Sequence, residues 1–216
     1  MAKDIESVID YFTELFPNAK CELNYETPYQ LLVAVILSAQ CTDKRVNQVT
    51  SNLFKLAPTP QKMIELGVEK LKEIIKSCGF FNQKAKSIIE TTNEIIIHHS
   101  GNVPNNMNEL TKLKGVGRKT ANVVLGEYYK VPSIAVDTHV LRISKRLKLT
   151  TKNATPEKCE KDLLKIVEKD KQVQFHHQAI WFGRYHCKAI NPNCKNCKLQ
   201  NRCTHYKEKS KKKIKE

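Results

Sequence analysis

The sequence predicts an all-α protein. Most long segments carry apolar residues at the spacing of an amphipathic helix, as in residues 5–15. Glycine and proline number only 7 and 8 among 216 residues, too few for the many tight turns of an all-β fold. No segment shows a convincing strand pattern, although β-branched runs such as residues 95–99 are ambiguous between helix and strand.

The helical patterns follow one another along the chain. The first covers residues 5–15 and ends near Pro17. The second, residues 28–40, is apolar nearly all round, which is typical of a central helix buried on every side. A helix also begins at Arg118, and the remaining patterns cover residues 42–56, 68–78, 82–99, 105–113, 155–169 and 175–187.

The charge of the chain indicates a polyanionic partner. Lysine and arginine number 37 against 22 acidic residues, giving a formal net charge of +15. Nucleic acid is the first candidate partner, and a merely soluble basic protein is the alternative. The longest apolar run, residues 31–37, is too short to cross a membrane, and the acidic N-terminal segment lacks the pattern of a signal peptide. We therefore expect a cytoplasmic protein, whose 8 cysteines would not form structural disulfides.

Four cysteines fall within residues 187–203, with the spacing C-x6-C-x2-C-x5-C: Cys187, Cys194, Cys197 and Cys203. Four thiolates can hold a zinc ion or an iron–sulfur cluster. Structural zinc usually uses two C-x2-C pairs, whereas this segment has one close pair with a single cysteine on either side. The spacing favours a [4Fe–4S] cluster, with zinc as the alternative. The same part of the chain carries basic residues that would attract phosphates, unless they are simply solvated: Arg184, Lys188, Lys195, Lys198 and Arg202. The scattered cysteines are expected to be ordinary core residues: Cys21, Cys41, Cys78 and Cys159.

Residues 113–125, LKGVGRKTANVVL, place two glycines before a helix. Gly115 and Gly117 permit a tight turn and the close approach of another backbone, and amides at a helix N-terminus can bind a phosphate. Lys119 is unusual, because cations are disfavoured in the first turn of a helix. The positive helix end and partial burial would favour the neutral amine, a nucleophile that forms Schiff bases. Contact with a phosphate is the alternative role for this lysine.

Asp137 lies at a change from apolar to polar sequence, before Thr138 and His139. Its carboxylate could take the proton from Lys119 or stabilise developing positive charge. An aspartate at this position is also typical of a helix N-cap, and His139 taken alone would be structural.

Together these motifs resemble those of the endonuclease III family of DNA glycosylases. Residues 113–147 are similar to the family's hairpin, catalytic lysine and aspartate motif, and residues 187–203 to its iron–sulfur loop. Residues 31–47 are similar to its first core helix and the loop that follows. The resemblance covers about residues 5–206. It departs from the family pattern at Lys114, where the family usually has proline before the first glycine. We expect lower rigidity there and altered DNA affinity without loss of chemistry.

The resemblance implies two helical lobes with DNA in the groove between them. Residues 22–132 would form a helical bundle that contains the helix–hairpin–helix. Residues 1–21 and 133–206 would form the lobe that carries the [4Fe–4S] cluster. Separately, the low-complexity, charged composition of residues 207–216 predicts a disordered basic tail.

The resemblance also implies a bifunctional DNA glycosylase and AP lyase of base excision repair. Such an enzyme excises oxidised pyrimidines from duplex DNA and cleaves the abasic site by β-elimination through a lysine Schiff base. Lys119 would be the nucleophile and Asp137 its charged partner. Gln40 would fill the gap left by the flipped nucleotide, and Phe80 or Phe81 would wedge into the opposite strand. The remaining expected DNA contacts are Lys114, Gly115, Gly117 and Arg118. The alternatives are a monofunctional adenine- or mismatch-specific glycosylase, whose known relatives usually lack the lysine, and a catalytically inert DNA-binding module.

Overall fold

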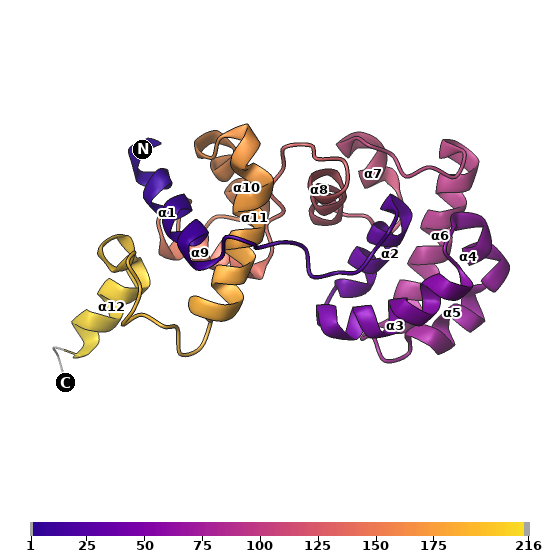
Figure 1. Ribbon diagram of the computed structural model, residues 1–216, viewed down its shortest axis with the longest axis horizontal. Helices are drawn as coiled ribbons and strands as arrows, with labels where there is room; N and C mark the ends of the chain where they lie inside the picture. The colour runs from indigo at the N-terminus through magenta and orange to yellow at the C-terminus, as the bar shows by residue number, and fades with distance from the viewer. Residues whose placement is uncertain (1, 214–216) are drawn as a thin grey trace. The chain divides into compact units, whose positions relative to one another are not determined.

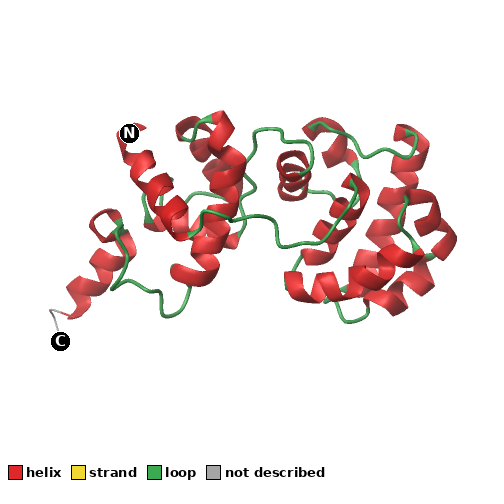
Figure 2. Ribbon diagram, viewed as in Figure 1, coloured by secondary structure: helices red, strands yellow, loops and turns green. Residues whose placement is uncertain are grey.

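The computed structural model describes the backbone of residues 2–213 and the side chains of residues 5–210. Within this range the chain forms helices and loops and no strand (Figure 2), which confirms the predicted all-α class. The described residues fall into two compact units. One is Cys21–Val131, and the other combines the residues up to Lys20 with those from Pro132 onward. None of the helices in the described part of the chain is long and apolar enough to span a membrane.

The unit Cys21–Val131 is built around one buried helix. Its helices are α2 (Pro28–Ser38), α3 (Asp43–Leu56), α4 (Pro60–Leu66), α5 (Val68–Ile75), α6 (Phe81–His99), α7 (Met107–Lys112) and α8 (Arg118–Glu127), as Figure 1 shows. Helix α2 begins with Thr27 as its N-cap, and every residue from 29 to 37 is buried. It packs against α3, α6 and α8. The prediction of a central helix is thus confirmed, but α2 ends two residues early, because Gln40 takes a left-handed backbone conformation.

Helix α4 was not predicted from the sequence. It has only seven residues, too few to establish a helical period, and it packs against α6. Its boundary signals were nevertheless present. The hydroxyl of Thr59 accepts the Lys62 N–H, Pro60 occupies the first turn, and Gly67 follows the last residue with a φ of +76°.

The other unit contains α1 (Ala2–Leu15), α9 (Thr138–Arg146), α10 (Pro156–Ile166), α11 (Gln172–Trp181) and α12 (Thr204–Lys213), together with three short turns, Lys169–Lys171, Phe182–His186 and Gln200–Arg202. Its core is aromatic. The Phe12 ring of α1 lies 4.6 Å from the Phe182 ring and 5.8 Å from the Phe175 ring, measured between centroids. All three rings are fully buried. Helix α1 therefore packs against residues that lie more than 150 positions later in the sequence.

The expected disorder of the basic tail is not found for residues 207–213, which belong to α12, whereas residues 214–216 lie outside the described range. Lysine and glutamate are good helix formers, and the Ser210 hydroxyl donates to the Tyr206 carbonyl one turn earlier. The helix also packs against α9, so this basic segment is anchored at its start.

Candidate functional site

The predicted hairpin is the turn between α7 and α8. Gly115 has a φ of +75°, and a Cβ at this position would lie only 2.9 Å from the Ser87 Cβ. Glycine is therefore required here for both conformation and space. Gly117 is different, because its φ of −83° suits any residue and no described atom lies within 4 Å of an added Cβ. The tight turn thus depends on Gly115, whereas the open space at Gly117 leaves room for the expected close approach of another backbone.

Three polar side chains of α6 hold the hairpin. The Lys114 N–H donates to Glu94 Oε2 at 2.9 Å, the Thr91 hydroxyl donates to the Lys114 carbonyl, and Ser87 lies against Gly115. These α6 residues are spaced by four and three, so they share one helix face. Sequence reasoning missed them, although a polar stripe at helical spacing could have indicated a face that packs against backbone.

The departure from proline at Lys114 has a structural counterpart. Proline has no N–H and could not donate to Glu94. In this chain a hydrogen bond to the Glu94 carboxylate therefore fixes this end of the hairpin. The family usually has the rigid ring of a proline at this position instead. This contact opposes the loss of rigidity that we expected from the sequence, and the altered DNA affinity stays a prediction.

Lys119 is the second residue of α8. The first turn of this helix contains no acidic residue, and Gly117, its N-cap, offers no side-chain acceptor to the backbone N–H groups. Lys119 and its neighbour Arg118 are exposed, so the expected partial burial of the lysine is not observed. The turn therefore presents an amine, a guanidinium and helix-end N–H groups to solvent, an arrangement suited to an anion.

Asp137 belongs to the other unit, where it caps α9. Its Oδ1 accepts the Val140 N–H at 2.8 Å, which confirms the N-cap interpretation. Because Oδ1 is occupied by this bond, a chemical role for the carboxylate would fall to Oδ2. Burial lowers the pKa of the nearby His139, and the negative charge of Asp137 acts in the opposite direction. Because Lys119 and Asp137 lie in different units, their pairing stays a prediction.

Gln40 and Phe80 lie on two turns that touch. Both have left-handed backbones, with φ of 51° and 58°, and a Cβ on Gly79 would lie 3.6 Å from the Gln40 carbonyl oxygen. Of the two phenylalanines considered for the wedge, Phe80 is 68% exposed, whereas Phe81 packs against the core. Left-handed non-glycine residues cost about 1–3 kcal/mol each and concentrate at functional sites.

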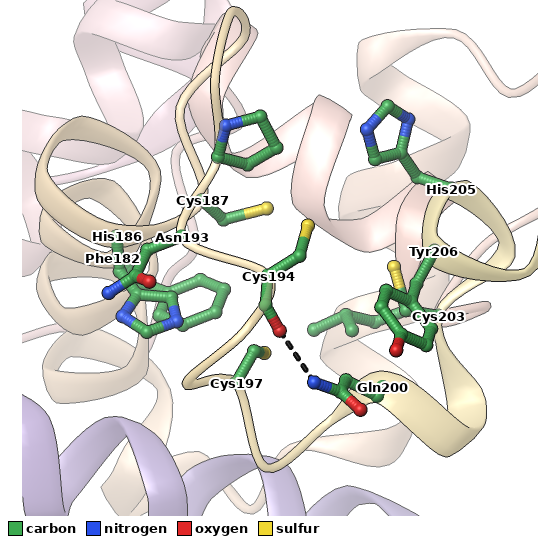
Figure 3. A pocket seen from close by; sticks show the side chains of 12 residues that line it. Phe182, His186, Cys187, Asn193, Cys194, Cys197, Gln200, Cys203, His205 and Tyr206 are labelled. Carbon is green, nitrogen blue, oxygen red and sulfur yellow. Dashed lines mark hydrogen bonds between the residues drawn. The ribbon is translucent and has the colours of Figure 1, made fainter. Parts of the chain in front are cut away.

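The four cysteines at 187–203 line one pocket, which Figure 3 shows from close by. The four cysteines thus lie together, and their predicted role as metal ligands stays a prediction. In the described part of the chain, no three His, Cys, Asp or Glu side chains are placed to hold a single metal ion. The pocket is also lined by Phe182, Leu147, His186, His205 and Tyr206.

One hydrogen-bond donor from outside the loop and one from within it hold Cys187 and Cys194. Arg146 of α9 donates from Nη1 to the Cys187 sulfur at 3.2 Å and to the Lys188 carbonyl at 2.9 Å. The Gln200 amide donates to the Cys194 carbonyl at 2.6 Å, as Figure 3 shows. Arg146 was not identified from the sequence, and it contributes positive charge beside a thiol.

The four thiols favour the binding of a positively charged metal centre in the pocket. Burial raises the pKa of Cys194 and of Cys197, and the neighbouring thiolates raise them further. Four thiolates would therefore repel one another in this pocket unless positive charge lay between them. The donor set fits a metal centre with four sulfur ligands.

The basic residues around this loop are not equally available. Lys198 pairs with Glu14 at 2.6 Å, and Arg202 donates to the Leu147 carbonyl at 3.3 Å. Lys188 and Lys195 are exposed. The surface that we predicted to attract phosphates therefore consists mainly of Lys188 and Lys195.

The end of α11 brings Cys187 to the pocket. Helix α11 continues into a π-helical turn, Phe182–His186, which ends at this cysteine. A Cβ on Gly183 in this turn would lie 2.8 Å from the His139 Cβ, so a glycine is needed for the turn to approach α9. Arg142 of α9 closes the contact by donating to the Gly183 and Cys187 carbonyls.

Comparison with known proteins gives a consistent result. Residues 33–169 match the family described as "HhH-GPD superfamily base excision DNA repair protein". The chain is 45% identical to endonuclease III of Bacillus subtilis over 97% of this chain and 96% of that protein. It is 44% identical to endonuclease III of Escherichia coli K12 over 96% of this chain and 97% of that protein.

Solved structures agree with this assignment. The structure described as a trapped endonuclease III–DNA covalent intermediate matches with a TM-score of 0.94 at 44% identity, over 97% of this chain and 99% of that one. A thermostable thymine-DNA glycosylase matches with a TM-score of 0.85 at 20% identity, covering 95% and 98% of the two chains, which shows a shared fold. The chain therefore belongs to the HhH-GPD superfamily of base excision DNA repair proteins and, within it, to the endonuclease III family.

Proposed function

We propose that the protein is a bifunctional DNA glycosylase and AP lyase that excises oxidised pyrimidines from duplex DNA. The observation that carries this proposal is the exposed Lys119 amine on an uncapped helix N-terminus, beside a hairpin that is already fixed by α6. A relative that is 44% identical forms, by the description of its structure, a covalent intermediate with DNA. That description supports covalent chemistry in this family.

DNA binding is assigned mainly to phosphate contacts. The first turn of α8 offers backbone N–H groups, Arg118 and open space above Gly117, so a phosphate can approach the backbone closely. Affinity should fall with rising salt, because each neutralised phosphate releases counterions. A damaged base that stacks or pairs weakly lowers the cost of flipping the nucleotide out.

The chemistry begins with the neutral form of Lys119. Its amine attacks C1′ of the flipped nucleotide, the bond from C1′ to the base breaks, and the sugar opens to an imine with the lysine. The imine acidifies the 2′ hydrogens, and β-elimination then breaks the strand on the 3′ side. Asp137 would accept the lysine proton or stabilise the developing positive charge, using the oxygen that does not cap α9. Gln40 and Phe80, on their two touching turns, would enter the space left in the duplex.

We also infer that Cys187, Cys194, Cys197 and Cys203 hold one [4Fe–4S] cluster. Their spacing, their shared pocket and the mutual repulsion of their thiolates support this inference. When bound, the cluster would supply the positive charge that the thiolates need and would order the loop carrying Lys188 and Lys195. No chemical step on DNA is assigned to it. We also propose that the protein is a monomer and that it is cytoplasmic, as expected from the sequence.

Borohydride trapping tests the proposal and separates it from its alternatives. The substrates are one duplex with an oxidised pyrimidine, one with a mismatched adenine and one without damage. A covalent adduct and strand cleavage on the first duplex alone would support the proposal. Base release without adduct or cleavage would favour a monofunctional glycosylase, and binding without base release would favour an inert DNA-binding module.

The role of Asp137 has its own test. Asp137→Asn removes the charge but keeps an oxygen that can cap α9, so the fold should be unchanged. Loss of a general base or charge partner lowers rates by about 10²- to 10⁴-fold. Single-turnover excision by Asp137→Asn would measure this loss, and thermal melting would check stability. A rate within twofold of the wild type would exclude the assigned role.

A further inference from the structure

Cys41 and Cys78 form a thiol pair beneath the turns that carry Gln40 and Phe80. The two cysteines are 37 positions apart in the sequence, yet their side chains share a hydrogen bond. Cys78 is 1% exposed, whereas Cys41 is partly exposed, so one residue of the pair is accessible to solvent. The expectation that both are ordinary core residues therefore holds for Cys78 only.

A buried amine lies close to both thiols. Lys84 is 6% exposed and donates to the Leu37 carbonyl at 2.8 Å, at the end of α2. Burial lowers its pKa, and the charges of Cys41 and Cys78 act in the opposite direction. Burial raises the pKa of Cys78 to about 11, while the positive charges of Lys84 and Arg45 lower it. These cations are the kind of neighbours that stabilise a thiolate.

The position of the pair connects it to the proposed DNA-contacting turns. Cys41 directly follows Gln40, and Cys78 precedes Phe80 by two residues. Both turns contain a left-handed non-glycine residue, and they touch where Gly79 approaches the Gln40 carbonyl. A bond between the two sulfurs would draw together two turns that are each in an unfavourable backbone conformation.

We propose that Cys41 and Cys78 are a modification site, oxidised by a small-molecule disulfide to an intramolecular disulfide that slows base excision. The effect on excision rests on the function proposed above. The contact between the sulfurs, the solvent-accessible member and the buried ammonium beside them carry the proposal. In the reduced chain both cysteines are free.

The reaction proceeds by two exchanges. The Cys41 thiolate attacks one sulfur of a low-molecular-weight disulfide such as glutathione disulfide, forming a mixed disulfide and releasing one thiolate. Cys78 then attacks the Cys41 sulfur, forming the internal bond and releasing the second small thiol. The two protein thiols are oxidised by two electrons, the external disulfide is reduced to two thiols, and these carry away both protons. An excess of a dithiol reverses the change.

The internal bond changes the spacing of the turns. A disulfide holds its sulfurs about 2.05 Å apart with a restricted dihedral angle, which is closer than a hydrogen-bonded thiol pair. Gln40 and Phe80 would therefore be displaced or stiffened, whereas the hairpin at Gly115 and Gly117 lies on a separate turn. We expect excision of a damaged base to slow on the order of tenfold, because small displacements of positioning groups have effects of this size or larger. Binding to undamaged duplex should change by less than twofold.

The test treats the holoprotein with glutathione disulfide in the absence of oxygen and has two independent readouts. Peptide mapping by mass spectrometry reports which cysteines are joined, and single-turnover kinetics reports excision before and after reduction with a dithiol. The variants are Cys41→Ser and Cys78→Ala, each checked for folding by thermal melting. Cys21→Ser is the matched control, because Cys21 is also partly exposed and lies in the same unit.

The expected result is a linked Cys41–Cys78 peptide in the wild type and in Cys21→Ser, with a reversible slowing that both pair variants lack. Absence of the linked peptide overturns the proposal, even if Cys41 carries glutathione. A linked peptide without slower excision overturns the regulatory role, and equal slowing in the variants assigns the effect to other cysteines. An inactive reduced wild type would count against the proposed function, while the peptide map would still decide whether the disulfide forms.

Discussion

The hairpin at residues 113–117 and the cysteine loop at residues 187–203 differ in what holds them. The hairpin is fixed by protein contacts alone, through the Glu94 and Thr91 hydrogen bonds and the close fit of Gly115 on Ser87. The cysteine loop places four thiols around one pocket, where burial and mutual repulsion disfavour the thiolates. The comparison teaches that the proposed phosphate site is held by protein contacts alone, whereas the proposed metal site would depend on its bound metal centre.

The largest effect is expected at the lysine beside the fixed hairpin. Lys119→Gln should abolish both the borohydride adduct and strand cleavage, because an amide cannot form an imine. Affinity for an abasic-site duplex should remain mostly intact, since phosphates supply most of the binding energy and the hairpin is unchanged. Arg118→Gln is the matched control, because it removes a neighbouring exposed cation without removing the nucleophile. Cleavage by Lys119→Gln, or a wild-type adduct mapped to another lysine, would show that the nucleophile is misassigned.

A large but different effect is expected in the cysteine loop. Cys194→Ala removes one of four thiolates, so iron content should fall well below the approximately four irons per chain that a cubane requires. Because loss of the guest removes the order of the loop, proteolysis within residues 187–203 should accelerate and the melting temperature should fall. Hydrogen exchange at the Lys114 amide should be unchanged, because that amide is held by Glu94. Stoichiometric zinc without iron in the anaerobically purified wild type would overturn the cluster assignment.

The two glycines of the hairpin provide a smaller and sharper test. Gly115→Ala should destabilise the unit by about 1–3 kcal/mol, because alanine disfavours a φ of +75° and its Cβ meets Ser87. Adding Ser87→Gly should recover only the part of this loss that comes from the clash. Gly117→Ala should leave the unfolding free energy unchanged while weakening DNA binding, because its open space serves an external ligand. Chemical denaturation and salt-matched binding measurements distinguish the two results, and equal stability losses would contradict the comparison.

The smallest effect is expected at the hydrogen bond that replaces proline. Glu94→Gln should reduce the stability of the hairpin by about 0.5–1.5 kcal/mol, because the Lys114 N–H then meets a neutral acceptor. In the Lys114→Pro background the same substitution should have almost no effect, because proline removes the donor. A double-mutant cycle by denaturation measures this coupling, and additive losses would show that the contact contributes nothing.

Sequence reasoning succeeded where a local signal was sufficient. The period of apolar residues located α2 and α6, and the run of Gly115 to Lys119 located the hairpin. The four cysteines that were identified by their spacing line one pocket. It failed where the signal was too short or depended on tertiary packing. Helix α4 is shorter than two helical periods, and the basic tail was judged by composition although its residues favour helix.

The remaining differences concern side chains whose environment is set by distant residues. The exposure of Lys119, the negative φ of Gly117 and the exposure of Phe80 depend on how the turns pack, and no local pattern determines them. The contact between Cys41 and Cys78 joins the turn that follows α2 to the turn that precedes α6. A single sequence does not contain that information, because both residues are compatible with a buried position in any helix.

The discontinuous course of the chain affects how the protein is made. Helix α1 is translated before the rest of its unit, and the partners of Phe12 in the core, Phe175 and Phe182, are translated more than 150 residues later. At typical rates of about 5–20 residues per second, this apolar helix waits on the order of 10 to 30 seconds without its core. The unit Cys21–Val131 is continuous and can fold during that interval. A nascent chain stalled after Val131 would therefore contain one folded unit and an uncovered α1, the state in which a chaperone would have the most to bind.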